Sequence, residues 1–240
     1  MTRRRWIADE VTGNTAALVG AHAAHLARVL RAEIGQEFDI ATGAEVRRGT
    51  ITSISDDRVE FALGKQQALN PIPKVTLALA IFKFDRMEWA IEKCTEIGVA
   101  RIIPVIARRT DTHLGAAAVK RHERWQRIVR QASEQSRRSA PPEIVAPVKL
   151  KDLAGAGVGP AGALTRVVLA ESEEDTRLGD ILQSSEVEVV LAVGPEGGWA
   201  DEEIAWFRET GWIAASLGNT ILRAETAAIV ATALALEALR

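Results

Sequence analysis

Cysteine is nearly absent from this chain of 240 residues, and tyrosine is wholly absent. The single cysteine, Cys94, excludes a disulfide framework and a zinc site built on several cysteines. No long hydrophobic run is present either, since the most apolar stretch, residues 224–239, contains two glutamates and is too short to span a bilayer. The basic residues that follow Met1 lead into no apolar segment, which argues against a signal peptide. We therefore expect a cytoplasmic protein.

Charge of one sign is also lacking, because the formal net charge is only −2. This balance argues against a protein that coats nucleic acid by bulk electrostatics. The distribution is less even: residues 101–138 are rich in arginine and residues 171–209 are rich in acidic side chains. Such asymmetry is typical of a polyanion-binding face, although a solvated helix face explains the arginines slightly better on charge alone.

Two rhythms divide the chain. Residues 1–70 alternate polar and apolar positions with period two, which predicts a small, mostly antiparallel sheet or barrel, with one short helix near residues 20–30. Residues 70–73, Asn-Pro-Ile-Pro, predict a linker, because proline continues neither a helix nor a sheet. From residue 74 to residue 240, continuous apolar strands alternate with helices. This pattern predicts an α/β domain whose parallel sheet is covered on both faces.

Several local expectations follow within these domains. We expect a helix to begin at Asp85 with a capping-box-like pair of Asp85 and Glu88. A longer helix is expected over residues 120–137. Core positions are predicted for four tryptophans and freer ones for the other two: Trp89, Trp125, Trp206 and Trp212 in the first group, and Trp6 and Trp199 in the second.

Two glycine-bearing loops near the C-terminus carry the strongest functional signal. The first is Gly-Pro-Glu-Gly-Gly at residues 194–198, and the second is Leu-Gly-Asn-Thr-Ile-Leu-Arg at residues 217–223. Each follows a predicted buried strand and opens into a helix, at the edge where open α/β sheets bind ligands. The two strands are expected to be neighbours. Glycine lets ligand atoms approach the backbone closely, so the two loops together predict a pocket, whereas the first loop taken alone is equally well explained as a tight turn.

Phosphate fingerprints are missing from both loops, which match neither GxGxxG nor GxxxxGK[ST]. Glu196 would repel a phosphate and would tolerate a cation or an amine. The expected ligand is therefore a flat, polar small molecule.

Several separated motifs resemble the RsmE-type family of S-adenosylmethionine-dependent 16S ribosomal RNA methyltransferases, in the SPOUT superfamily. The resemblance covers nearly the whole chain. Its motifs are the two loops with Ala224-Glu225-Thr226-Ala227, Asp85-Arg86-Met87-Glu88-Trp89 with Lys93, Thr95-Glu96 and Gly98, Arg124-Trp125 with Glu134-Gln135-Ser136-Arg137, and His25-Leu26 with Arg28-Val29-Leu30-Arg31.

The resemblance implies a fold and a cofactor. The fold is a SPOUT α/β trefoil-knot domain with a mostly parallel sheet at residues 74–240, preceded by a PUA-like RNA-binding β-barrel at residues 1–70. The protein is expected to be a homodimer that uses S-adenosyl-L-methionine and no metal. The implied cofactor-binding residues are Leu169, Gly194, Pro195, Glu196, Gly197, Gly198, Leu217, Gly218, Ile221, Leu222, Arg223 and Thr226.

The implied reaction is methyl transfer to N3 of a uridine in 16S rRNA of the small ribosomal subunit. N3 lies on the Watson–Crick edge, so the base must be unpaired or flipped out. Arg137 and Arg223 are candidates to hold a phosphate or a base carbonyl. Glu196 or Glu225 is a candidate proton acceptor, and spacing chooses neither, although a carboxylate favoured by the helix dipole is the better explanation of Glu225.

RNA binding in the first domain would fall to basic side chains around its short helix. The candidates are His25, Arg28 and Arg31, together with Arg137 near the C-terminal end of the arginine-rich stretch. An equally good explanation is that His25 and Arg28 stabilise the small barrel. A metal site at His22 and His25 is rejected, because no carboxylate or cysteine joins them in the sequence. Since tyrosine is absent, base stacking would fall to Trp, Phe, His or Arg.

The chain departs from the family at three places. Phe84 stands where the family often has glycine. Asn219-Thr220 stands where the family usually has Pro-Arg, which puts one RNA or cofactor contact in doubt. Ala200 stands where a serine often caps the next helix, and Asp201 is expected to replace part of that cap. Two alternatives remain open: another SPOUT RNA methyltransferase, acting on a ribose 2′-hydroxyl or a tRNA base, and a non-catalytic ribosome-assembly protein that binds RNA.

Overall fold

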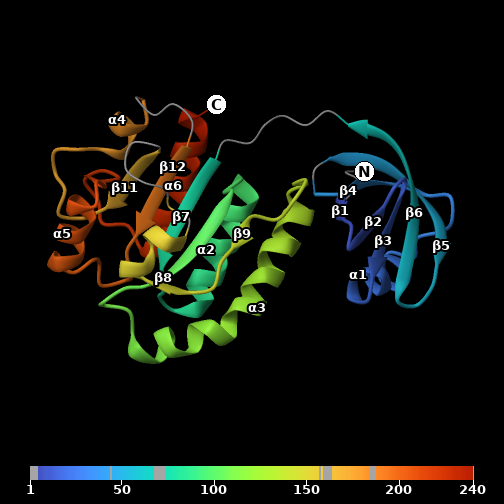
Figure 1. Ribbon diagram of the computed structural model, residues 1–240, viewed down its shortest axis with the longest axis horizontal. Helices are drawn as coiled ribbons and strands as arrows, with labels where there is room; N and C mark the ends of the chain where they lie inside the picture. The colour runs from blue at the N-terminus through green and yellow to red at the C-terminus, as the bar shows by residue number, and fades with distance from the viewer. Residues whose placement is uncertain are drawn as a thin grey trace. The chain divides into compact units, whose positions relative to one another are not determined.

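The structure is a computed structural model that describes residues 5–43, 45–67, 74–156, 158, 164–183 and 188–239. Contacts between residues divide the chain into two compact units (Figure 1). One unit is Met1–Pro71 with Ser133–Pro141, and the other is Ile72–Ala132 with Pro142–Arg240.

The first unit is a six-stranded, mostly antiparallel sheet, as the period-two pattern predicts. Its strand order is β1-β4-β5-β6-β3-β2, and only the β1–β4 pair is parallel. A short helix closes over a core that includes Leu18, Leu26, Ile40 and Phe61. The elements are β1 (Arg5–Ile7), β2 (Glu10–Thr12), β3 (Thr15–Val19), α1 (Ala21–Ala24), the π-helical turn η1 (His25–Val29), β4 (Glu37–Ala41), β5 (Val46–Ile54) and β6 (Arg58–Gln67).

The second unit contains a parallel sheet whose strand order is β10-β8-β7-β12-β11-β13, with β9 paired to β8. The strands are β7 (Lys74–Ala80), β8 (Arg101–Ile106), β9 (Glu143–Ile144), β10 (Val148–Lys149), β11 (Thr165–Leu169), β12 (Glu188–Val193) and β13 (Ile213–Ala215). The helical elements are α2 (Phe84–Ile97), α3 (Thr112–Gln135), the 3₁₀ turns η2 (Leu150–Asp152) and η3 (Ala154–Ala156), α4 (Leu178–Leu182), α5 (Asp201–Glu209) and α6 (Ala224–Ala238).

Alternate residues of the central strands enter two separate cores, because side chains of a strand point to opposite faces. Along β7, Val75, Leu77 and Leu79 join one core with side chains of α2, α3, α4 and α6. Ala78 and Ala80 join the other core, which α5 and the turns η2 and η3 cover. The predicted sheet with helices on both faces is therefore confirmed (Figure 1).

The start of α3 differs from the prediction. The helix begins at Thr112 instead of near residue 120. Asp111 explains the earlier start, because its Oδ1 accepts the His113 N–H at 2.8 Å and its carbonyl accepts the Gly115 N–H at 2.9 Å. The Asp111 carboxylate therefore caps the helix N-terminus. The helix can then start before Gly115, which interrupts the apolar pattern.

The capping box predicted at Asp85 and Glu88 is wrong. No side chain caps α2. Glu88 instead joins α2 to α3, because its carboxylate oxygens lie 3.1 Å from Arg121 Nη1 and 2.8 Å from Arg124 Nε. Glu88 therefore forms ion pairs between α2 and α3 in place of a cap on its own helix.

Three of the tryptophan predictions are also wrong. Trp6 and Trp199 are buried, with 1% and 7% of their surfaces exposed, whereas Trp89 is 48% exposed. Trp125 and Trp212 are buried as predicted. Trp199 is buried because Phe207 packs edge-on against it, at 4.9 Å between ring centroids. In the part of the chain that the structure describes, no helix combines the length and the apolar character that crossing a membrane requires.

Candidate active site

A cavity of about 860 Å³ opens at the carboxyl edge of the parallel sheet in the second unit. Its size lies within the range of about 300–1,000 Å³ that is usual for small-molecule sites. Three chain segments form most of its wall: residues 193–201 after β12, residues 169–174 after β11 and residues 215–224 after β13. Arg86, Arg109, Ile204 and Ala227 complete the lining.

The first loop, residues 194–198, is shaped by a tight turn and by a ring above it. The Gly198 N–H donates to the Pro195 carbonyl at 2.8 Å, and Gly198 has a φ of 68°, which favours glycine. A Cβ added at Gly194 would lie 3.2 Å from Trp199 Nε1 and 3.3 Å from Cδ1. The indole of Trp199 therefore requires the bare backbone of Gly194.

A buried carboxylate holds the end of this loop. Glu203 is 8% exposed, and its Oε2 accepts the Ala200 N–H at 2.9 Å. Its Oε1 accepts the Arg108 N–H at 2.8 Å. The prediction that Asp201 replaces part of the missing serine cap is wrong, because no side chain caps α5 in that way. Glu203 instead accepts the N–H of the N-cap residue Ala200 itself. The capping-box spacing from residue 200 to residue 203 was the available signal.

The second loop, residues 217–223, lies one strand further away than predicted. β11 separates β12 from β13, so the two strands are not neighbours. Residues 170–178 run beside the end of β13, with the Ala170 N–H on the Ala215 carbonyl at 3.0 Å and the Ser216 N–H on the Thr176 carbonyl at 2.9 Å. The acidic turn that follows β11, residues 171–174, thereby lines the cavity between the two loops. Sequence reasoning missed these residues beyond Leu169.

Asn219 has a partner from that same segment. Arg177 Nη2 donates to Asn219 Oδ1 at 3.2 Å. The position that departs from the family's Pro-Arg is therefore joined to an arginine that lies elsewhere in the sequence. Gly218, beside it, has a φ of 127°, which again favours glycine.

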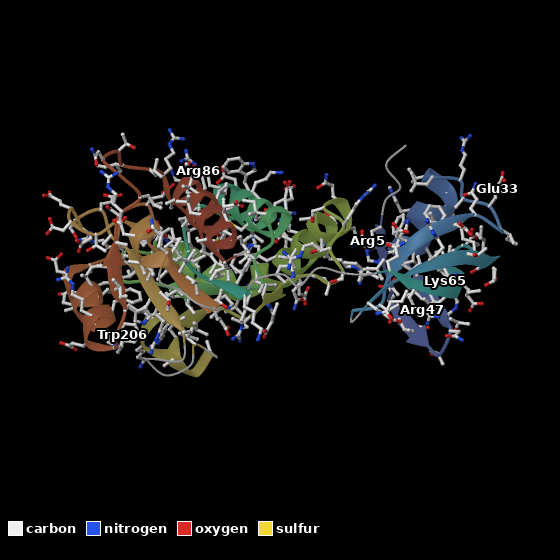
Figure 2. All side chains as sticks on the ribbon, turned by 90° about the horizontal axis from the view of Figure 1, so that it is seen from above. Arg5, Glu33, Arg47, Lys65, Arg86 and Trp206 are labelled. Atoms are coloured by element: carbon white, nitrogen blue, oxygen red, sulfur yellow. The ribbon has the colours of Figure 1, made fainter. Side chains whose placement is uncertain are left out.

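Arg86 lies between the two candidate proton acceptors. Its Nη1 is 3.3 Å from Glu225 Oε1 and 4.0 Å from Glu196 Oε1. The Glu196 side chain is 39% exposed and lines the cavity, whereas the Glu225 side chain is 8% exposed and does not. The Arg86 side chain, labelled in Figure 2, therefore links the first loop to the first turn of α6.

Arg109 holds the opposite side of the first loop. Its Nη1 donates to the Gly197 carbonyl at 2.8 Å. The turn that carries Arg109 follows β8 and is fixed by Thr110, whose Oγ1 accepts the Ala107 N–H and donates to the Ile81 carbonyl, each at 3.1 Å. Nothing in the sequence patterns singled out Arg109.

The structure brings most of the expected cofactor-binding residues together. Of these residues, Thr226 does not line the cavity. Arg137, a candidate to hold a phosphate or a base carbonyl, belongs to the first compact unit. The expected residues that do line it are Leu169, Gly194, Pro195, Glu196, Gly197, Gly198, Leu217, Gly218, Ile221, Leu222 and Arg223.

The candidate RNA-binding residues of the first unit have other contacts. The ring of His25 lies 6.0 Å from that of Trp6, and exposed Arg28 pairs with Asp56 at 3.0 Å. Arg31 and Arg137 are both exposed and have positive φ angles, and the Arg137 carbonyl accepts a hydrogen bond from Arg5. An RNA-binding role for these four residues therefore stays a prediction.

His22 has a carboxylate neighbour that the sequence did not reveal. Its Nδ1 lies 3.3 Å from Asp9 Oδ2, which also accepts the Val19 N–H. Among the described residues, no group of three or more His, Cys, Asp or Glu side chains is arranged to hold a metal ion.

The fold and the cavity are those of an α/β protein with a small-molecule site, and the comparisons identify the class as RNA methyltransferase. Residues 69–236 match a family model described as an RNA methyltransferase domain. Ribosomal RNA small subunit methyltransferase E of Synechocystis sp. is 36% identical to this chain, over 94% of this chain and 74% of its own length. The same enzyme of Aquifex aeolicus is 30% identical, over 92% and 93%. The chain therefore belongs to the ribosomal RNA small subunit methyltransferase E family.

Solved structures show the same likeness. The enzyme of Neisseria gonorrhoeae, solved with bound S-adenosyl methionine, has a TM-score of 0.85 and 30% identity, covering 96% of this chain and 95% of its own. A Legionella pneumophila protein solved with the cofactor SAM has a TM-score of 0.82 and 30% identity, covering 98% and 97%.

Proposed function

We propose that this protein transfers a methyl group from S-adenosyl-L-methionine to N3 of a uridine in the 16S rRNA of the small ribosomal subunit. The observation that carries the proposal is the cavity between the two glycine loops, in a chain of this family. Two similar structures are described as containing the same cofactor.

The cavity suits this cofactor chemically. Its glycine backbones offer N–H and C=O groups at close range, and Leu169, Leu217 and Leu222 offer apolar surface to a flat base. The carboxylates of residues 171–174 favour a ligand that carries a cationic sulfonium and an amine. When bound, the cofactor supplies a methyl group that is already activated.

The protein then has two tasks: to align the uridine with the methyl group, and to accept the N3 proton. Glu196 is the better candidate acceptor, because it lines the cavity whereas Glu225 does not. Arg223 lines the cavity at the end of the second loop and is placed to hold a base carbonyl or a phosphate. Arg137, exposed on the first unit, is proposed to contact RNA.

The finer architecture is proposed with this function. We infer that residues 74–240 form a SPOUT trefoil knot, which is supported by the passage of residues 170–178 beside the end of β13, immediately before the second loop. Residues 1–70 would form the PUA-like RNA-binding domain. The protein would act in the cytoplasm as a homodimer, which the exposed Trp89 on α2 and Leu234 on α6 support.

Calorimetry and mass spectrometry together test the proposal. The wild-type protein is expected to bind S-adenosylmethionine and to methylate small subunits that lack the modification. Glu196→Gln, which keeps the size of the side chain, is expected to retain cofactor affinity and to lose turnover at neutral pH, with Glu202→Gln as the matched control. A protein that binds no cofactor, with or without RNA, would refute the enzymatic function. Methylation of a ribose or of a tRNA would refute the target.

A further inference from the structure

Two arginines and the acidic turn lie on opposite sides of the first loop in the cavity wall, whereas Arg223 lies at the end of the second loop. In the sheet order β8-β7-β12-β11-β13, the acidic turn after β11 lies on one side of the first loop. Arg86 and Arg109, which follow β7 and β8, lie on the other side. A ligand that is cationic at one end and a substrate that is a polyanion would therefore be drawn to opposite sides.

The two arginines differ in whether a nearby carboxylate offsets their charge. Arg86 faces Glu225 at 3.3 Å and Glu196 at 4.0 Å, so two carboxylates offset its charge. Arg109 is exposed, and the partner that the structure records for it is the neutral carbonyl of Gly197. Among the described residues that line the cavity, Arg109 and Arg223 are the arginines with no carboxylate within salt-bridge distance.

We infer that Arg109 is a substrate-positioning residue that binds a backbone phosphate of the RNA beside the target nucleotide. The inference rests on the proposed function and adds a residue and a direction of approach to it. A guanidinium has five N–H donors, and one of them is used on Gly197, so the others remain available for a phosphate. RNA would then approach over the first loop from the β8 side, away from the acidic turn.

The hydrogen bond to the first loop also orients the Arg109 side chain. Because Nη1 is held by the Gly197 carbonyl, the guanidinium is oriented before RNA arrives. The rigid turn at Thr110 fixes the backbone that carries it. Pre-orientation lowers the entropy that binding must offset. A phosphate bound here would be tied to the same loop that lines the cofactor cavity.

Arg108 supplies a matched control next door. It has the same charge and an exposed side chain, but its guanidinium pairs with Glu202 at 2.9 Å and it does not line the cavity. Arg109→Gln removes the charge and keeps an amide N–H donor on a shorter side chain. Arg108→Gln removes a charge that is already paired.

The experiment measures binding of the full-length proteins to a 16S rRNA fragment at several salt concentrations, together with KM for the small subunit. For Arg109→Gln we expect RNA affinity to fall by about threefold to tenfold, and the slope of log K against log salt to fall by about one. KM rises in the same proportion, while cofactor affinity by calorimetry falls by less than RNA affinity does. Arg108→Gln is expected to behave as wild type.

Three outcomes would overturn the inference: wild-type RNA affinity and slope in Arg109→Gln, an equal loss in Arg108→Gln, or a loss confined to cofactor affinity. Failure of the proposed function is a separate result. If the wild-type protein binds RNA through Arg109 and transfers no methyl group, the enzymatic function fails and the RNA contact stands.

Discussion

A side chain at Gly194 is expected to destabilise the protein because of the Trp199 indole ring. A Cβ at this position would lie 3.2, 3.3 and 3.4 Å from Nε1, Cδ1 and Cε2 of Trp199, so the indole would have to move by a few tenths of an ångström. Trp199 has little room to yield, since it is 7% exposed and packs on Phe207. Overpacking of this kind typically costs about 1–3 kcal/mol.

The Gly194→Ala variant should therefore be less stable than the wild type. In a protein of this size, each kcal/mol lowers Tm by roughly 2–4 °C, so we expect a fall of roughly 2–12 °C in scanning calorimetry. The shifted indole also borders the cavity, so cofactor affinity should fall with it. Gly197→Ala is the control, because its Cβ would contact only Arg109, at 3.6 and 3.8 Å.

A double-mutant cycle isolates the ring as the cause. Trp199→Phe removes part of the indole, so Gly194→Ala should cost much less in that background than in the wild type. An unchanged Tm in Gly194→Ala, or the same loss with phenylalanine at residue 199, would refute the steric reasoning.

Three further perturbations have expected outcomes. Glu203→Ala leaves the Ala200 and Arg108 N–H groups without their acceptor, and should cost about 2–4 kcal/mol in urea unfolding; a loss no larger than that of Glu202→Ala would contradict this. Gly49→Ala would place a Cβ 2.5 Å from Ile40 Cγ1 and 3.2 Å from Phe61 Cβ, so it should destabilise the first unit by about 1–3 kcal/mol in the same assay, whereas wild-type stability would show that this core is loose. Burial raises the pKa of the Cys94 thiol from 9.0 to about 12; the neutral thiol stabilises the fold fully below pH 9, and that contribution is lost as pH rises toward 12. Cys94 should accordingly resist thiol reagents at pH 8 until the protein unfolds, and rapid labelling of the native protein would disprove the burial.

Periodicity was a good guide to the elements because burial repeats along each strand and helix. It predicted the parallel sheet and the inward side chains Met87, Ala90 and Trp125, each of which is fully buried. It failed where a single polar contact decides. Asp111 begins α3 early, and Glu88 pairs across helices, and neither contact has a sequence period.

The cavity was predictable in its glycine loops and not in its other walls. Each loop closely follows its own strand along the sequence, so local sequence patterns reveal it. The acidic turn enters the cavity only because β11 lies between β12 and β13, and strand order is a property of the whole sheet. Arg109 reaches Gly197 from far earlier in the chain, a contact that no local pattern encodes.

Methylation of the small ribosomal subunit tests the central claim most directly. Small subunits that lack the modification would be incubated with the wild-type protein and S-adenosylmethionine, and the 16S rRNA would be digested for mass spectrometry of its nucleosides. We expect one new 3-methyluridine, with the reaction abolished in the Glu196→Gln variant. The appearance of no methylated nucleoside, or of a methyl group on a ribose 2′-oxygen, would contradict the account.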